Sequence, residues 1–264
     1  MEFQEVIYSR EDGVATMALN RPEALNALTP RMVDEVVMAI EEAKQDNDVK
    51  VVVLTGAGRG FCSGMDVRAV AARGPQASLV ERRNEMRESI HRVPRALAGL
   101  DKPLIGSING AAAGAGMDMA SMCDLRIASN KAKFAMSYVR MGLIPGDGGC
   151  YFLPRIIGMA RALELIWTGR MIDAEEALRI GYVNKVVPHQ ELAAATRELA
   201  TQLARGPAIA IQLAKRLAYR GLYMDLNTAL EAAETAQLIA RSTEDAIEGP
   251  RAWVEKREPR FKGK

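Results

Sequence analysis

The sequence predicts an α/β fold with a largely parallel sheet, followed by a wholly helical C-terminal part. Two observations carry this prediction. Up to about residue 188, short apolar strand patterns alternate with helical patterns, and strands that alternate with helices pair in parallel through right-handed crossovers. After Pro188 only helical spacing remains. This shift near residues 190–205 indicates a helical appendage that packs on the core or faces another subunit.

The first strands and the first helix have clear local signals. Val14–Leu19 reads as a strand. Thr29-Pro30 then provides an N-cap and a proline at the first helical position, and apolar residues recur at helical spacing to about Asp46. The β-branched run Val51–Leu54 is typical of a strand buried on both faces.

The alternation continues through the middle of the chain. A helix over about 78–98 precedes a strand at Leu104–Ile108. Asp124–Ala128 and Gly181–Val187 read as further strands, with helical pattern between them. The C-terminal helices are expected at about 189–204, 208–220, 225–241 and 243–257.

Composition places the chain among soluble globular proteins. It has 264 residues, of which 48% are hydrophobic and 26% charged, enough for one large domain or a domain with an appendage. The formal net charge is +2 and the basic residues are spread out, which argues against nucleic acid as the main partner. No run approaches the roughly 20 apolar residues of a membrane span, and the N-terminus lacks a signal-peptide pattern.

We therefore expect a cytoplasmic protein that makes no membrane contact. Its three cysteines, Cys62, Cys123 and Cys150, have neither paired spacing nor a histidine nearby in sequence. They are expected to be reduced thiols rather than disulfide partners or metal ligands.

Two strands run into glycine-rich turns that end in Met-Asp: TGAGRGFCSGMD (55–66) and NGAAAGAGMD (109–118). Glycine lets the backbone approach a ligand closely, and a helix start leaves N–H groups unpaired. Two such turns that face each other would direct two N–H donors at one oxygen, as in an oxyanion hole. Either turn alone could be only a tight turn. The first lacks the G-x-G-x-x-G spacing, so dinucleotide binding is not indicated.

The two aspartates that close these turns differ in their surroundings. Asp66 stands where a helix N-cap would be. Asp118 lies about three residues into a predicted helix, among Met117, Met119 and Met122. A buried carboxylate needs a partner or a raised pKa, and an acid–base catalyst near neutral pH uses a raised pKa. The alternative is that Asp118 only stabilises the helix N-terminus.

The chain resembles the enoyl-CoA hydratase/isomerase (crotonase) superfamily over nearly its full length. The resemblance rests on LNRPEALNAL (19–28), VVVLTGAGRGFCSGMDV (51–67), KPLIGSINGAAAGAGMDMASMCDLRIAS (102–129), GLIPGDGGCYFLPRIIG (142–158), TGRMIDAEEALRIGYVNKVVP (168–188) and the tail VEKREPRFKGK. It implies a crotonase-like spiral of β-β-α repeats with the acyl-CoA site over residues 1–200. It also implies a helical trimerisation region over 201–264, in a homotrimer or homohexamer.

The same resemblance implies a CoA thioester substrate, with coenzyme A as part of that substrate and no separate cofactor. The two oxyanion-hole amides of the family fall on Met65 and Ala115. The positions that contact CoA, the last two of them supplied by a neighbouring subunit, fall on Ala24, Ser63, Val67, Phe261 and Lys262.

The chain departs from the family at the acids. The hydratases hold water between two glutamates, and these positions are Asp118 and Tyr138 here. Tyrosine, with a reference pKa near 10, is a poor general base at pH 7. Asp147 in IPGDGG (144–149) is a candidate second acid, because that loop borders the acyl pocket of the family. The alternative is that Asp147 caps a helix that begins at about Gly148.

The preferred interpretation is an acyl-CoA-processing enzyme that stabilises a thioester enolate. Enoyl-CoA hydration comes first, double-bond isomerisation second, and ring opening or C–C bond hydrolysis of a cyclic ketoacyl-CoA third. A non-catalytic CoA- or RNA-binding protein on the same fold is the hypothesis from a different class. His91 and His189 have no acid or nucleophile at a telling spacing and are expected to be structural or solvated.

Overall fold

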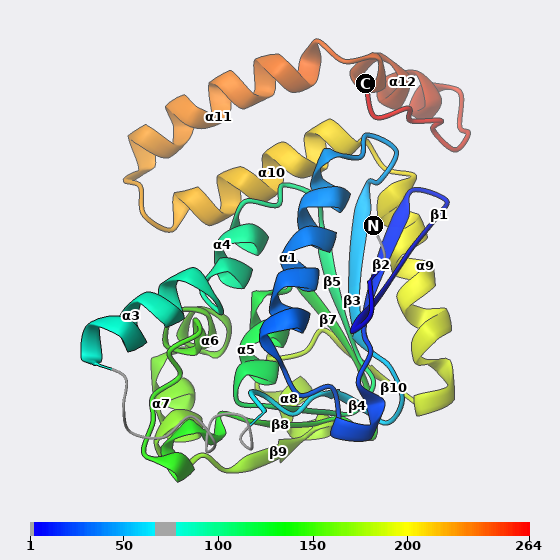
Figure 1. Ribbon diagram of the computed structural model, residues 1–264. Helices are drawn as coiled ribbons and strands as arrows, with labels where there is room; N and C mark the ends of the chain where they lie inside the picture. Colours follow the sequence, from blue (N-terminus) through cyan, green and yellow to red (C-terminus); the bar gives the residue numbers. More distant parts are fainter. Residues whose placement is uncertain (1–2, 67–77) are drawn as a thin grey trace.

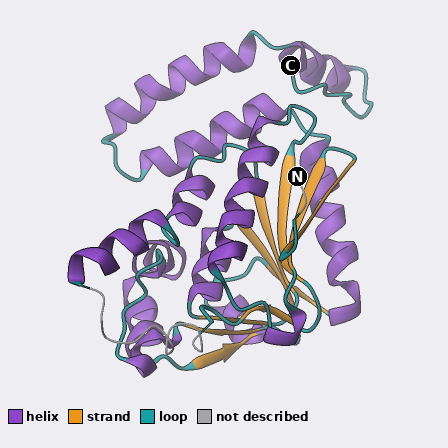
Figure 2. Ribbon diagram, viewed as in Figure 1, coloured by secondary structure: helices purple, strands orange, loops and turns teal. Residues whose placement is uncertain are grey.

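The computed structural model describes residues 3–66 and 78–264, and its strands form two sheets (Figures 1 and 2). The larger sheet has the order β1-β2-β3-β5-β7-β10 and the smaller one the order β4-β6-β8-β9. All neighbours pair in parallel except β1 with β2 and β8 with β9. The larger sheet consists of β1 (Val6–Glu11), β2 (Val14–Leu19), β3 (Val51–Gly56), β5 (Leu104–Ile108), β7 (Leu125–Ser129) and β10 (Lys185–Val187). The smaller consists of β4 (Gly60–Cys62), β6 (Ala111–Ala113), β8 (Lys133–Ala135) and β9 (Met171–Asp173).

From β3 to β8, consecutive strands alternate between the two sheets, which makes this part of the chain a spiral. β3, β5 and β7 enter the larger sheet, and β4, β6 and β8 follow each of them into the smaller one. Each coil of the spiral therefore carries the chain from the larger sheet to the smaller one. The predicted crotonase-like spiral is confirmed, and the helical C-terminal region is present.

Helices cover both faces of the larger sheet (Figure 1). Apolar side chains of α1, α4 and α5 join the main core, while Leu199 and Ala200 of α9 pack on Val51, Val53 and Ile105. The helices are α1 (Pro30–Gln45), α3 (Leu79–Glu88), α4 (Arg92–Ala98), α5 (Ala115–Met122), α6 (Gly149–Ile157), α7 (Met159–Thr168), α8 (Ala174–Arg179), α9 (Leu192–Ala204), α10 (Ala208–Gly221), α11 (Leu226–Arg241) and α12 (Glu244–Val254). Three short 3₁₀ turns are η1 (Pro22–Ala24), η2 (Ser137–Met141) and η3 (His189–Glu191).

Local signals placed most of these elements correctly. The Thr29 side chain accepts a hydrogen bond from Met32 N at the start of α1, as an N-cap does. The single helix predicted over 78–98 is wrong in one respect: it is α3 and α4, separated at Ser89–His91. α3 has no buried residue, so its exposed surface carries no apolar stripe that would have shown where it ends. The strand predicted over Gly181–Val187 is shorter, since β10 begins at Lys185.

The C-terminal helices extend away from the sheets. α10 lies against the core, whereas α11 and α12 lie beyond it, at the top of Figure 1. Large apolar side chains on these helices are exposed, among them Leu226, Leu238, Ile247 and Trp253, the last 85% exposed. The division of the chain at residue 200 stays a prediction. Within residues 3–66 and 78–264, none of the helices is both long and apolar enough to cross a bilayer.

The start of α5 packs directly on the end of β4. A Cβ added at Gly116 would lie 2.0 Å from the carbonyl oxygen of Cys62, which is far inside contact distance. Because that oxygen belongs to the backbone of a buried strand, it cannot rotate away. Only glycine allows the first turn of α5 to approach β4 this closely.

We expect Gly116→Ala to lower the free energy of unfolding by about 2 kcal/mol or more, since overpacked cores lose roughly that much. Urea denaturation followed by circular dichroism measures the change. Gly221→Ala is the matched control, because nothing lies within 4 Å of a Cβ at that helical position. Equal stability of the two variants would contradict the close approach.

Candidate active site

The first glycine-rich turn directs the Met65 amide away from its neighbouring segment. Leu28 and Met65 form a parallel bridge, in which Leu28 N donates to Gly64 O at 2.8 Å and Asp66 N donates to Leu28 O at 3.1 Å. Backbone N–H groups alternate in direction along an extended segment. The N–H of Met65 therefore points to the side opposite Leu28.

The second glycine-rich turn leads from β6 into α5. Gly114 has φ +52°, a conformation that favours glycine, and α5 begins at Ala115. The N–H of Ala115 is one of the first-turn donors that have no acceptor within their own helix. The turn thus presents a backbone donor at the helix N-terminus.

The two turns lie side by side. Gly64, the residue before Met65, is so close to the second turn that an added Cβ would lie 3.5 Å from Ala115 N and 2.9 Å from Ala113 O. The amides predicted for the oxyanion hole therefore belong to two adjacent backbone segments. Their joint role in holding one oxygen stays a prediction.

Two buried asparagines hold the first turn, and sequence reasoning missed both. The Asn26 side-chain amide donates to Ala57 O, Gly60 O and Phe61 O, at 2.9, 2.9 and 3.2 Å. The Asn109 amide donates to Gly58 O and Gly60 O, at 2.9 and 3.1 Å. A turn with so many glycines has few side chains to fix it, so distant amides fix its carbonyls instead. Both asparagines lie within the matching stretches LNRPEALNAL and INGAAAGAGMD, but nothing in those letters indicates their partners.

Asp118, Tyr138 and Asp147 form one hydrogen-bonded cluster. Tyr138 Oη lies 2.6 Å from Asp118 Oδ2 and 2.8 Å from Asp147 Oδ2. Asp118 comes from the first turn of α5, Tyr138 from η2, and Asp147 from the loop that precedes α6. Asp118 is fully buried, and Tyr138 and Asp147 are each 7% exposed. The structure thus brings together the three residues predicted for the chemistry.

The proton count of this cluster is constrained by Tyr138. A phenol has one proton and can donate to one carboxylate at a time. For both short contacts to be hydrogen bonds, the other carboxyl must donate to Tyr138 Oη and must itself be protonated. At least one of the two carboxyls is therefore protonated, and the two are joined through a shared hydroxyl.

Burial explains why an acid can stay protonated here. Desolvation, together with the nearby Asp147 carboxyl, raises the pKa of Asp118 to about 7, against the opposing effect of the Tyr138 hydrogen bond. Desolvation also raises the pKa of Asp147 and that of Tyr138. The amides of Gly149 and Asp147 lie near enough to Asp118 to lower its pKa somewhat. Neither makes a regular hydrogen bond to Oδ1, which has no partner among the described residues.

Asp147 does not cap α6. Gly148 is the N-cap of that helix, with φ +118°, and α6 has no side-chain cap. Instead the Asp147 carboxyl turns to Tyr138. The next residue but one, Gly149, lies against Asp118, because an added Cβ would be 2.3 Å from Asp118 Oδ1. The alternative interpretation of Asp147 as a cap is wrong, and the loop serves the acid cluster.

The candidate CoA contacts fall into two groups. Ser63 Oγ donates to Ala24 O at 3.3 Å, so these two positions adjoin each other beside the first turn. Phe261 and Lys262 lie in the tail that follows α12 and contacts it: Phe261 packs near Gly249, and Lys262 Nζ pairs with Glu244 at 2.9 Å. Within one chain, the C-terminal tail lies at the top of the molecule, well apart from α5 and α6 (Figure 1). Val67 lies outside the described residues.

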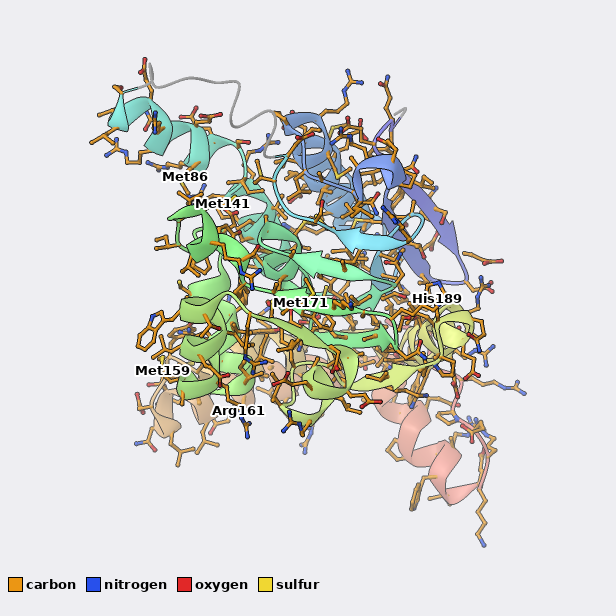
Figure 3. The ribbon with its side chains drawn as sticks, turned by 90° about the horizontal axis from the view of Figure 1, so that it is seen from below. Met86, Met141, Met159, Arg161, Met171 and His189 are labelled. Carbon is orange, nitrogen blue, oxygen red and sulfur yellow. The ribbon has the colours of Figure 1, made fainter. Side chains whose placement is uncertain are left out.

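The remaining candidates lie apart from this chemistry or at its edge. Cys62, Cys123 and Cys150 are free thiols. No group of three metal-binding side chains occurs in the part of the chain that the structure describes. His189 Nδ1 lies 3.0 Å from Ser129 Oγ, at the opposite side of the molecule from Met86 and Met141 (Figure 3). His91 contacts the loop of Asp147 and was not expected to do so.

Fold and cluster together define an α/β spiral enzyme with buried acid–base groups beside two backbone donors. Comparison with known proteins agrees. The family model described as enoyl-CoA hydratase/isomerase matches residues 9–264. The chain is 39% identical to a short-chain-enoyl-CoA hydratase of Clostridium acetobutylicum over 258 residues, 97% of each chain. It is 38% identical to a 1,2-epoxyphenylacetyl-CoA isomerase of Escherichia coli over 269 aligned positions, covering all of both chains.

A solved structure agrees as well. The enoyl-CoA hydratase of Bacillus anthracis superimposes with a TM-score of 0.92 at 34% identity, over 99% of this chain and all of the other. The chain belongs to the enoyl-CoA hydratase/isomerase family. It is therefore an enzyme of that family, rather than the non-catalytic binding protein that the sequence left open.

Burial of these acids should make the stability of the protein fall as pH rises. A carboxyl with a folded-state pKa near 7 and an unfolded value of about 3.9 holds its proton only in the folded state between those pH values. Its contribution is present below about pH 4 and is lost as pH rises through 7. We expect wild-type unfolding free energy to drop by a few kcal/mol from pH 5 to pH 8. Urea titrations at both pH values should show a smaller drop for Asp118→Asn, and an identical drop would contradict the raised pKa.

Proposed function

We propose that the protein acts on acyl-CoA thioesters by stabilising a thioester enolate. The observation that carries the proposal is the buried cluster in which Tyr138 joins two carboxyl groups, beside the start of α5. In this proposal the N–H groups of Met65 and Ala115 donate to the thioester oxygen. They accept the charge that develops there, and donors arranged in advance do so without reorganising solvent.

The first reaction that we propose is hydration of a 2-enoyl-CoA. A carboxylate takes a proton from water while the water oxygen bonds to the β-carbon, and the electron pair of the double bond moves onto the thioester oxygen. The enolate then takes a proton at its α-carbon from the neighbouring carboxylic acid. The cluster supplies both groups at once, since one of its carboxyls is charged and the other neutral. The hydratases among the relatives support placing hydration first among the candidate reactions.

The route of the proton supports roles for all three residues. Asp118 has no exposed surface, whereas Tyr138 and Asp147 retain 7% each. A proton that Asp118 exchanges by way of the cluster therefore passes through the Tyr138 hydroxyl. We assign Asp118 to proton delivery and removal, with Tyr138 and Asp147 as the groups that recharge it.

Double-bond isomerisation is the second candidate, and one observation favours it. Tyr138 stands where a two-glutamate hydratase has its second glutamate, and its hydroxyl is already engaged by both carboxyls. A proton removed at one carbon could return at another through the same cluster, with no water consumed. The isomerase among the relatives supports this candidate. Hydrolysis of a C–C bond in a cyclic ketoacyl-CoA is third.

The assembly that we propose is a homotrimer or homohexamer. Its support is the exposed apolar surface of the C-terminal helices, with Leu238 at 70% and Ile247 at 72%. Such a surface fits a second copy of the chain. Phe261 and Lys262 would then reach the CoA of a neighbouring subunit. We further propose a cytoplasmic enzyme that needs no cofactor or metal beyond its CoA substrate and binds neither nucleic acid nor membrane.

Asp118→Asn should lower turnover by about 10²–10³, since a positioned acid–base group contributes roughly that factor. The substrates are crotonyl-CoA, a 3-enoyl-CoA and a cyclic 2-ketoacyl-CoA, with products identified by mass in H₂O and D₂O. A gain of one water identifies hydration, and an unchanged mass with a moved double bond identifies isomerisation. Asp48→Asn, at an exposed carboxylate, is the control. Undiminished turnover by Asp118→Asn would remove this residue from the mechanism.

Ala115→Pro tests the backbone donor. Proline is well tolerated at the first position of a helix, so α5 can persist while the N–H is replaced by the ring Cδ. We expect kcat to fall by about 10²–10³, the usual cost of one oxyanion donor. Leu226→Pro makes the same change at the first position of α11, and should retain activity. If both variants fold, bind CoA and turn over equally well, Ala115 is not a donor to the reacting oxygen.

A further inference from the structure

The loop that carries Asp147 is tied to a distant histidine. His91, at the start of α4, places its Nε2 3.0 Å from the carbonyl oxygen of Gly146, 55 positions away in the sequence. A carbonyl oxygen only accepts hydrogen bonds. His91 Nε2 must therefore carry a proton, whichever charge the ring has.

The segment around Asp147 is rich in glycine, which fixes the backbone weakly by itself. Glycines flank the residue on both sides, at Gly146 and Gly148, and Ile144 is 74% exposed. Gly146 N donates to Ile144 O at 2.7 Å, a contact within the loop itself. The Met86 side chain lies against Gly146, since an added Cβ would be 3.2 Å from its Cε. The helical segment with Met86 and His91 thus holds the loop from outside.

The position of Gly146 determines where the Asp147 carboxyl lies. The two residues are adjacent, and Asp147 Oδ2 must stay 2.8 Å from Tyr138 Oη for the proton-sharing arrangement to persist. A shift of about 1 Å can cost two orders of magnitude in rate at such a site. A contact that holds the loop in place therefore also holds the Asp147 carboxyl in place.

We propose that His91 is a positioning residue: its Nε2–H holds the Gly146 carbonyl and thereby keeps Asp147 on Tyr138. The inference rests on the proposed function only through the role of the cluster. The imidazole touches the loop backbone rather than the reacting atoms. It acts by fixing the carboxyl that recharges Asp118.

Three variants, assayed with the acyl-CoA that the wild type turns over, distinguish a positioning role of His91 from other roles. His91→Phe keeps a ring but loses the donor, and we expect kcat to fall by at least about tenfold with KM changed less than about twofold. His91→Gln keeps an N–H at similar reach and should recover most of kcat. His189→Gln, at the only other histidine of the sequence, should match the wild type. Wild-type kcat in His91→Phe overturns the proposal, as does a Gln variant no better than Phe.

A second measurement needs no activity and no folded variant of His91. Nitrogen-15 NMR of the wild type, with His189→Gln to assign the second ring, should show His91 protonated at Nε2 with slow exchange of that hydrogen. A ring protonated only at Nδ1 overturns the proposal. If no acyl-CoA is turned over, the proposed function fails while this measurement still decides the contact of His91.

Discussion

The structure depends on how closely two backbone segments approach each other. The first turn of α5 lies on the last residue of β4, with no room for a Cβ at Gly116. This contact joins the helix to the smaller sheet and sets the Ala115 amide beside the segment of Met65. Small residues in 109–116 are needed because the approach is between main chains. Buried asparagine side chains then hold the carbonyls that the glycines cannot, so the rigidity of the site comes from residues far from it in sequence.

The acid cluster depends on that arrangement in turn. Asp118 is buried because α5 is buried along its whole length, and an isolated buried carboxylate would be unstable. Tyr138 and the Asp147 loop supply the hydrogen bonds, while one retained proton limits the charge. In the function that we propose, the two carboxyls have different roles although they are chemically alike. Their difference comes from position and exposure, as is general for acid–base pairs in enzymes.

Elements with a repeating apolar pattern could be predicted from sequence, and contacts between elements could not. Val51–Leu54 and Leu104–Ile108 read correctly as strands because burial on both faces leaves a run of apolar residues. The strands of the smaller sheet have three residues each, too few for a period to show. Asp118 was recognised by its apolar neighbours. Whether Asp147 caps a helix or faces Tyr138 depends on the conformation of its loop, which the spacing of residues in the sequence does not determine. The contact between His91 and Gly146 could not be predicted either, because it depends on the conformation of the same loop.

The exposed C-terminal helices have a consequence for how the chain folds. α11 and α12 present side chains such as Trp253 and Leu238 to water when the chain is alone, and that surface costs free energy until something covers it. If other copies of the chain cover it, folding and association become one equilibrium, and the melting temperature then depends on protein concentration. In such an assembly, dilution would destabilise the folded chain.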